Sequence, residues 1–464
     1  MNKMKKVGVA ALAAAMCVGI VPVTAGAEEM TTVTIWSGEA HSEAVMQEVF
    51  KNWNETVGKE AGIQIEYTVQ GGDSFSQMID LALQSGTAPD FWSGGSIANL
   101  ADNGYIMAYD DILSAEQIEQ FYEEYSGMLL EKQDTYEGKL YSIPLTSSPY
   151  GLIYNKDMFK AAGIVDENGE AKPPRTLEEM REYAKILTDP DKKQYGIIFP
   201  KKWDGWFGFD INSPASSYSG SYTEYNWATD DYDLSHMKPF MQLVLDMIED
   251  GSVYPGMDSI DNDTARAIFA EGSVGMKYGA SFDVGVLNDQ FPATCEWGAV
   301  SYPMVDEEHD YKAYTWYGRS YRVNANSEVP VEKLKVVLEL LLSDEYAVEM
   351  YKGSVYYPLD SSILVGVEAD NPKMGWTDFG LMASDVTGTA GSPATDMDGL
   401  RGIQAIFLED ILPGNMSIDE GIALAEENLR LGRERYCEAH PDYDTHQYAN
   451  PDWTPELKAR DYEK

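Results

Sequence analysis

Cysteine is nearly absent from this chain. Its 464 residues contain three cysteines, of which only Cys295 and Cys437 lie beyond residue 27. Two scattered cysteines do not make a metal site, so we expect no thiolate-bound metal. The two thiols could form a disulfide in an oxidising compartment, but sequence spacing alone does not show whether they do.

Positive charge is also scarce. Lysine and arginine number 34 against 77 aspartates and glutamates, which gives a formal net charge of −43. Loss of the first 27 residues, which carry three lysines and no acids, would make it −46. A surface this acidic repels nucleic acid and anionic lipid, so we expect no nucleic-acid partner. A polyanionic ligand is disfavoured too, although one local arginine could outweigh the average charge.

Recognisable catalytic motifs are missing. The chain has no phosphate-binding Gly-x-x-x-x-Gly-Lys loop, no Gly-x-Gly-x-x-Gly turn, no Gly-x-Ser-x-Gly elbow and no His-Glu-x-x-His. Acidic groups such as Asp258, Asp261 and Asp263 do not match the twelve-residue calcium loop, and solvated loops explain them. With 77 acidic residues, two carboxylates lie at the spacing of a glycosidase pair somewhere by chance, so the sequence does not support a catalytic pair. We expect no enzyme, no cofactor and no metal.

The N-terminal 27 residues have the pattern of a secretory signal peptide. Lys3, Lys5 and Lys6 precede the apolar run Val7–Val21. Ala25–Ala27 then supplies a small-x-small cleavage site. The run is too short to span a bilayer comfortably, and Pro22 closes it. We therefore expect residues 1–27 to be removed and the protein to act outside the membrane.

Cys17 leaves a second possibility for this leader. A cysteine inside a signal sequence can be the attachment point of a lipid anchor. Here Met16 is bulky just before it, and no leucine stands at the usual place upstream. Release of the cleaved chain is the favoured expectation, with lipid anchoring at Cys17 as the alternative.

The start of the mature chain predicts a parallel sheet. Thr31–Trp36 and Ile63–Val69 are rich in β-branched and aromatic residues, and an amphipathic helix is expected between them from Ser42. Another helix and a third short strand at Pro89–Trp92 follow. Strands that alternate with helices favour an α/β fold whose sheet is covered on both faces. The length of 28–464 implies two or three domains.

Capping patterns locate later helices. A Ser or Thr followed three residues later by Glu or Gln is typical of a helix N-terminus. The pattern occurs at Ser114 with Gln117, at Thr176 with Glu179 and at Ser417 with Glu420. Apolar periodicity predicts further helices at Thr264–Phe269 and Val331–Leu342, and a strand at Val274–Tyr278.

Residues 201–233 have a different texture. Eight aromatic residues stand among Gly, Ser, Asn and Asp, and neither a period of two nor one of 3.6 is sustained. The pattern indicates an irregular, aromatic-rich insertion. Its rings could form a hydrophobic cluster beneath long loops, or they could stack on a ligand, and the sequence does not decide between these. The tail from His440 onward is expected to pack as an extended strap or to fray.

Five segments, in order along the chain, carry a family resemblance. They are Thr34–Glu39, Leu83–Trp92, Ile143–Ile164 with the following Pro174–Glu179, Ala267–Met276, and Phe407–Gly414. Together they resemble the carbohydrate-type extracellular solute-binding proteins of ABC importers, the maltose-binding-protein-like family. Any one segment is weak, whereas five in order are specific for the superfamily and less so for the ligand.

The resemblance implies a two-lobed, periplasmic-binding-protein-like (Venus flytrap) α/β fold with a multi-strand hinge. The N-terminal lobe would comprise 28–143 and 297–343, and the C-terminal lobe 144–296 and 344–464, which includes 201–233. Ligand would lie between the lobes at the carboxyl ends of strands, the usual place in open α/β sheets. The implied function is capture of a sugar or oligosaccharide by a monomer that delivers it to an ABC permease.

The candidate ligand contacts are aromatic, hydroxyl, amide and charged groups in loops that follow strands. Some follow the first three predicted strands, two come from the insertion, and those near 148–150 and 279–282 are placed by the resemblance. They are Trp36, Ser37, Glu39, Asp73, Trp92, Ser93, Ser96, Ser148, Tyr150, Trp206, Trp227, Gly279, Ser281, Phe282, Trp316, Tyr317 and Arg319. For any single ring the alternative is core packing, and for Glu39 and Asp73 it is a helix N-terminus.

Three other functions remain open on the sequence. A receptor for a peptide or small anion would be favoured if Arg319, Arg322 or Arg401 projected into the cleft. A secreted glycan-cleaving enzyme would need a fixed pair of carboxylates in a rigid cleft. A structural cell-surface protein would have no cleft that closes.

Overall fold

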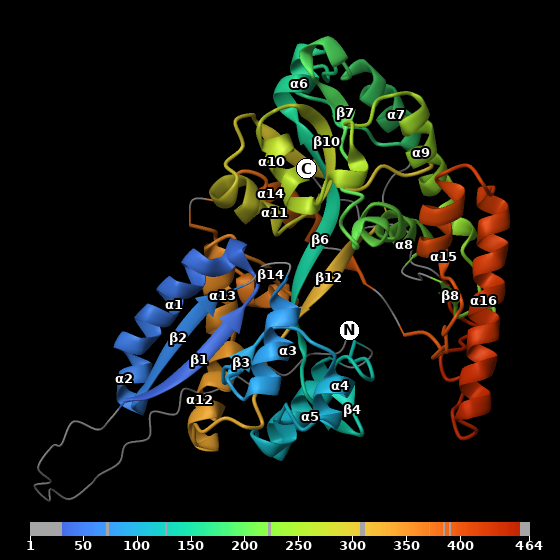
Figure 1. Ribbon diagram of the computed structural model, residues 1–464. Helices are drawn as coiled ribbons and strands as arrows, with labels where there is room; N and C mark the ends of the chain where they lie inside the picture. The colour runs from blue at the N-terminus through green and yellow to red at the C-terminus, as the bar shows by residue number, and fades with distance from the viewer. Residues whose placement is uncertain are drawn as a thin grey trace, which may run out of the picture.

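The computed structural model describes residues 30–70, 74–125, 128–220, 224–306, 311–370, 372–383, 386–388 and 391–454. The expected signal peptide, Cys17 and Asp73 lie outside these residues. Figure 1 shows two α/β lobes joined by long strands, with the blue N-terminal elements in one lobe and the green and red elements in the other. The two-lobed fold expected from the sequence is confirmed.

The N-terminal lobe is built on a four-stranded sheet in the order β13-β3-β1-β2. Strand β1 (Thr31–Ser37) lies parallel to both β2 (Ile63–Val69) and β3 (Phe91–Trp92), as the sequence predicts. Strand β13 (Arg322–Val323) returns antiparallel to β3. The helices of this lobe are α1 (Glu43–Glu55), α2 (Val57–Ala61), α3 (Phe75–Ser85), α4 (Ile97–Asp102), α5 (Ala115–Glu124), α12 (Val331–Leu341) and α13 (Asp344–Lys352).

Apolar spacing explains how these helices cover the sheet. Helix α1 buries Met46, Phe50 and Trp53, which recur at helical spacing on one face. They pack in one core cluster with the buried strand residues Val33 and Ile35. Helices α12 and α13 complete the same cluster from much later in the sequence.

The hinge is a set of paired strands. Strand β6 (Pro144–Asn155) runs from the N-terminal lobe into the other lobe, as Figure 1 shows. Strand β12 (Ala313–Arg319) pairs antiparallel with its first half, and β14 (Tyr357–Pro358) pairs with the same stretch. The hydroxyls of Ser147 and Thr315 lie 2.8 Å apart across the β6–β12 pair. Three segments of the chain therefore meet at the junction between the lobes.

The C-terminal lobe continues from the second half of β6. Its seven-stranded sheet has the order β15-β12-β6-β10-β7, and β11 and β14 also pair with β6. The added strands are β7 (Tyr195–Ile197), β10 (Val274–Ala280), β11 (Trp297–Val300) and β15 (Val386–Thr387). The main helices are α6 (Lys156–Ala161), α7 (Leu177–Ile186), α9 (Lys238–Glu249), α10 (Asn262–Ala270), α14 (Trp376–Ala383), α15 (Ile403–Ile406) and α16 (Ile418–Ala439).

Two of the three expected capping boxes form in full. The side chains of Ser114 and Ser417 accept from the backbone three residues on, and the return hydrogen bonds are present in both cases. At α7, Thr176 accepts from the backbone N–H of Glu179 at 3.1 Å, and the Glu179 carboxylate accepts from the backbone N–H of Arg175 at 2.8 Å. The helix starts were thus readable from sequence, although one cap differs in detail.

We propose lobe boundaries that differ from the sequence-based ones in two places. Residues 297–306 stay with the C-terminal lobe, because β11 pairs with the second half of β6 and Tyr302 lies in that lobe's core. Residues 344–355 stay with the N-terminal lobe, where Tyr346 is part of the core. We propose that the N-terminal lobe comprises residues up to 143 and 320–358, and the C-terminal lobe 144–319 and 359–454.

Residues 201–233 are more regular than their sequence pattern indicates. They contain the π-helix η5 (Gly208–Asn212), helix α8 (Ser213–Ser219) and the hairpin of β8 (Tyr225–Asn226) and β9 (Asp231–Tyr232). The hydroxyls of Ser213 and Ser216 donate to carbonyls of the preceding turn at 2.8 Å, so buried serines stand where apolar residues would reveal a helix.

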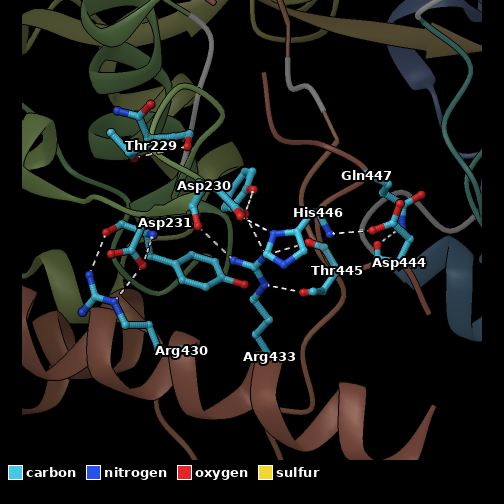
Figure 2. Close-up of polar contacts among 12 residues, drawn as sticks. Thr229, Asp230, Asp231, Arg430, Arg433, Asp444, Thr445, His446 and Gln447 are labelled. Atoms are coloured by element: carbon cyan, nitrogen blue, oxygen red, sulfur yellow. Dashed lines mark hydrogen bonds and ion pairs between the residues drawn. The ribbon is translucent and has the colours of Figure 1, made fainter. Parts of the chain in front are cut away.

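The tail crosses the C-terminal lobe as a strap, which we define as residues 440–454. Figure 2 shows its central contact, where Arg433 of α16 donates to Asp230 at 2.7 Å and to Thr445 at 2.6 Å. His446 of the strap and Tyr225 also contact the Asp230 carboxylate. The strap expected as one alternative for this tail is therefore present.

The two thiols that could have formed a disulfide are both free. Cys295 is buried just before β11, and Cys437 is partly buried on α16. Within the described residues, no helix combines the length and apolar character needed to cross a bilayer. Nor does that part of the chain bring together three histidine, cysteine or acidic side chains that could hold a metal ion.

Candidate binding site

A cavity of about 720 Å³ lies between the N-terminal lobe and the hinge strands. Its wall combines the loops after β1 and β3 with the end of β12, the segment leading into β13, and residues around α13. Two smaller hollows, of about 270 and 300 Å³, share lining residues with it at Ser93–Ser96 and at Trp316. The three hollows adjoin one another along the N-terminal lobe and the hinge strands.

The loops after β1 and β3 place small polar groups on this wall. Ser93 and Ser96 line the cavity, and Gly95 between them has a φ of +92° that favours glycine. Glu39 is exposed on the cavity wall after β1. Its backbone N–H donates to the buried Ser37 hydroxyl at 3.1 Å, so Ser37 shapes this loop from behind. The carboxyl ends of the parallel strands thus open into the cavity, as in other open α/β sheets.

Trp316 is the exposed aromatic ring of the site. It lies on β12 opposite Ser148 of β6, and 51% of the residue is accessible to solvent. Neighbouring Thr315 points the other way and is buried, as strand alternation requires. The indole lines both the large cavity and the adjoining 300 Å³ hollow. A large apolar ring left in water beside a cavity is suited to stacking on a flat apolar surface.

Three tyrosines add phenol groups to the wall opposite these loops. Burial raises the pKa of Tyr321, Tyr346 and Tyr356 well above the usual value. All three line the cavity, so they present neutral hydroxyls that can donate and accept hydrogen bonds. The strand-end reasoning did not include them, and only Tyr321, two residues after Arg319, stood near a predicted contact in sequence.

Arg319 lines the cavity but is already paired. Its Nε donates to Oδ1 of Asp134 at 2.8 Å, and its Nη1 donates to the Tyr317 carbonyl at 2.9 Å. Asp134 is fully buried behind it. The guanidinium therefore holds the end of β12 in place, and its charge is balanced by a carboxylate of the protein.

The structure brings only part of the predicted set to the cavity. Glu39, Ser93, Ser96, Trp316, Tyr317 and Arg319 line it. Ser37 and Ser148 lie directly behind or beside it, and Trp36 packs with Phe75 and Trp92 in a small core cluster. Arg322, named above only for the alternative of an anionic ligand, also lines the cavity, and other residues at the wall were not anticipated as contacts: Met46, Lys132, Gln133, Leu145, Thr146, Tyr321, Tyr346 and Tyr356.

The candidates from the C-terminal lobe are mostly packed inside it. Tyr150 and Trp206 lie in the main core, and Gly279 and Ser281 are buried at the end of β10. Phe282 is partly buried, with its ring centroid 6.2 Å from that of Tyr150. Trp227 donates its indole N–H to Gly391 at 2.8 Å and packs on Trp453 of the strap. None of these residues lines the described 720 Å³ cavity.

The lobes touch each other on one side of the cleft. The ring of His41, from η1 (Ala40–Ser42), lies 6.2 Å from that of Phe282. Gly285 approaches so closely that an added Cβ would stand 3.0 Å from the His41 carbonyl. Burial, the largest influence on His41, lowers the pKa of its imidazole. Glu39 and Ser42, close to His41 in the sequence, line the cavity, so the contact between the lobes adjoins it.

Comparison with known proteins places the chain in context. Residues 38–348 match the model of a family described as bacterial extracellular solute-binding protein. A maltotriose-binding protein of Pyrococcus abyssi is 22% identical over 248 residues, which cover 52% of this chain and 48% of the relative. An sn-glycerol-3-phosphate-binding periplasmic protein of Brucella melitensis is 26% identical over 274 residues, which cover 58% and 60%. The chain thus spans about half the length of the curated relatives it matches.

Solved structures share the architecture more completely than the sequence. The maltose/maltodextrin-binding domain MalE from Bdellovibrio bacteriovorus, solved with maltotriose, superposes with a TM-score of 0.62 at 16% identity. The superposition covers 88% of this chain and all of that domain. At this low sequence identity the superposition shows a shared fold only. That fold is the two-lobed α/β arrangement described above.

Proposed function

Because this chain belongs to the family of bacterial extracellular solute-binding proteins, we propose that it captures a saccharide in its cavity and delivers it to the permease of an ABC importer. The observation that carries the proposal is Trp316, half exposed beside a cavity of about 720 Å³. The apolar face of a pyranose ring can stack on such an indole. Serine and tyrosine hydroxyls around the ring can pair with the sugar hydroxyls, which otherwise resist desolvation.

Binding should favour closure of the two lobes. A ligand in the cavity that also contacts the C-terminal lobe once the lobes close binds the closed form better, and it shifts the population by its difference in affinity. Cleavage after Ala27 would release the receptor outside the membrane as a monomer, and its closed face would be what a permease recognises. These aspects of localisation, partner and assembly are part of the proposal.

An enzymatic role has less support than a binding role. Hydrolysis of a glycosidic bond normally uses two carboxylates that flank the bond. Glu39 is the single carboxylate among the residues that line the described cavity. The relatives and the superposed structure are named for binding, and the relatives' ligands include a phosphate ester as well as a sugar.

A melting assay of the mature chain tests the proposal. Each member of a panel of mono- and oligosaccharides is added at increasing concentration, with di- and tripeptides as a second panel. A true ligand at a hundredfold excess over its Kd stabilises the folded protein by about 2.7 kcal/mol. A shift with peptides and with no saccharide would refute the assignment.

A further inference from the structure

We propose that the saccharide carries an acidic group, a carboxylate or a phosphate, and that Arg322 and Lys132 are the protein's contacts to it. The inference rests on the proposed function, since it names the class of saccharide that the same cavity takes. It draws on two features of the cavity wall: its local charge, and one buried guanidinium that lacks a counter-ion among the described residues.

The charge balance of the cavity wall is opposite to that of the whole chain. Across the chain, 77 acidic residues outnumber 34 basic ones. The residues lining the cavity include the basic side chains Lys132, Arg319 and Arg322 and the one acid Glu39. Arg319 is neutralised by Asp134, which leaves two cations against one exposed carboxylate. A wall of this sign attracts an anion even though the protein as a whole repels one.

Arg322 is the residue that lacks a counter-ion. It is 4% exposed, and its Nη1 and Nη2 donate only to the carbonyls of Ser320 at 3.2 Å and Gly95 at 3.5 Å. Its Nε has no hydrogen-bond partner, and no carboxylate pairs with it among the described residues. Burial, the main influence, lowers the pKa of this guanidinium. A buried cation held by two carbonyls is costly, and an anion in the cavity would offset that cost.

The other well-buried arginines of the protein show what Arg322 is missing. Arg266 pairs with Asp283 at 2.7 Å, Arg319 with Asp134 at 2.8 Å, and Arg433 with Asp230 at 2.7 Å. Each of these pairs is closed within the protein. Arg322 is more buried than Arg319 and lies on the cavity wall without a carboxylate partner, so its remaining N–H donors can bind an oxyanion that enters the cavity.

Lys132 supplies a second cation at the mouth of the same cavity. It lies in a turn with a φ of +66°, and its Nζ stands 5.8 Å from the ring centroid of Tyr436 on α16. The contact reaches from the N-terminal lobe toward the C-terminal one. No carboxylate pairs with Lys132 within the described residues, so its ammonium can turn to an anionic ligand that enters beside it.

The test is a calorimetric titration of the mature protein with matched neutral and acidic sugars. The pairs are glucose with glucuronic acid, and galactobiose with digalacturonic acid, while glucose 6-phosphate represents the phosphate source. The acidic member of a pair should bind about 10- to 100-fold more tightly, because hydrogen bonds to charged groups are the strong ones. That advantage should shrink as sodium chloride is raised.

Three variants assign the effect to residues. Arg322→Met should abolish the preference for the acidic member, and Arg322→Lys should restore part of it. If Arg322→Met does not fold, Lys132→Gln tests the inference, because Lys132 is exposed and its substitution does not disturb the core. Lys132→Gln should lower the affinity for acidic ligands several-fold and leave the affinity for neutral ligands unchanged. Lys59→Gln, which makes the same change in charge on the exposed side of α2, is the control and should do neither.

The outcomes separate this inference from the proposed function. Preferential binding of uronates or of the sugar phosphate, with a reduced preference in Lys132→Gln, supports the inference and identifies the acidic group. Equal binding of neutral and acidic members, with no effect of Lys132→Gln, overturns the inference and leaves the saccharide receptor intact. Binding of no saccharide, neutral or acidic, would remove both.

Discussion

The two lobes use the same kind of strand end in different ways. In the N-terminal lobe, the loops after β1 and β3 leave Glu39, Ser93 and Ser96 on the wall of a cavity. In the C-terminal lobe, the end of β10 and the adjacent β6 are covered by the protein's own rings. Tyr150 packs on Phe209 with centroids 4.4 Å apart, and Phe209 belongs to the π-helix η5. Position at a strand end therefore predicts where a residue lies, whereas exposure depends on what the rest of the chain places over it.

Trp206→Ala should give the largest effect, and on stability rather than on binding. Trp206 is 1% exposed in the C-terminal core, and removal of a buried tryptophan costs about 3–5 kcal/mol. Urea unfolding measures the loss, and titration of the surviving folded protein should give an unchanged affinity. A tenfold loss of affinity without destabilisation would break the comparison between the lobes, because it would make this ring a ligand contact.

Asp210→Asn tests the buried charge of the same lobe. Burial raises the pKa of Asp210 from 3.8 to about 7, and Lys277 opposes the shift. Between these values the carboxyl is ionised in the unfolded chain and protonated in the folded one. The free energy of unfolding therefore falls as pH rises through this window. Relative to the wild type, Asp210→Asn should gain about 2–3 kcal/mol between pH 5 and pH 8. If the free energies of unfolding of the two proteins changed in parallel across that pH range, the raised pKa of Asp210 would be contradicted.

Trp316→Ala should mirror Trp206→Ala, with loss of binding and little loss of stability. The ring is half exposed, so we expect a stability change below about 1 kcal/mol and a roughly 10- to 100-fold weaker affinity for the best saccharide. Tyr150→Phe, which alters a buried ring farther along the hinge strand β6, should keep affinity within about twofold. A larger loss of affinity at Tyr150 than at Trp316 would show that the ligand binds on the C-terminal core side and not in the described cavity.

Asp230→Asn should have the smallest effect and act on the strap alone. Burial acts to raise the pKa of Asp230, but hydrogen bonds from Tyr225, Arg433 and His446 outweigh it and lower the pKa. The carboxylate thus stabilises the fold above pH 4, and this contribution fades as pH falls through the lowered pKa. We expect a loss of about 1 kcal/mol at pH 7 that shrinks as pH falls through the lowered pKa, with faster proteolysis within 440–454. Loss of sugar affinity would show that the strap reaches the site.

The sequence predicted most of the N-terminal lobe and little of the cavity's far wall. The bounds of β2 and the start of α1 follow from β-branched runs and apolar spacing, which are local signals. Helix α8 was hidden because buried serines bond to their own backbone and leave no apolar period. Arg322, Tyr346 and Tyr356 reach the cavity through the late return of the chain to the first lobe. That return depends on long-range strand pairing, which no local pattern records.

The single open indole also provides a built-in optical signal. All ten tryptophans lie in the described residues, and Trp316 alone among them is exposed, while Trp92, Trp206 and Trp297 are almost fully enclosed. Excitation at the red edge of absorption favours the indole in water over those in dry surroundings. A guest that covers it would move that emission to shorter wavelength and protect it from acrylamide. Occupancy could then be followed in the unmodified protein, without a dye or a radioactive sugar.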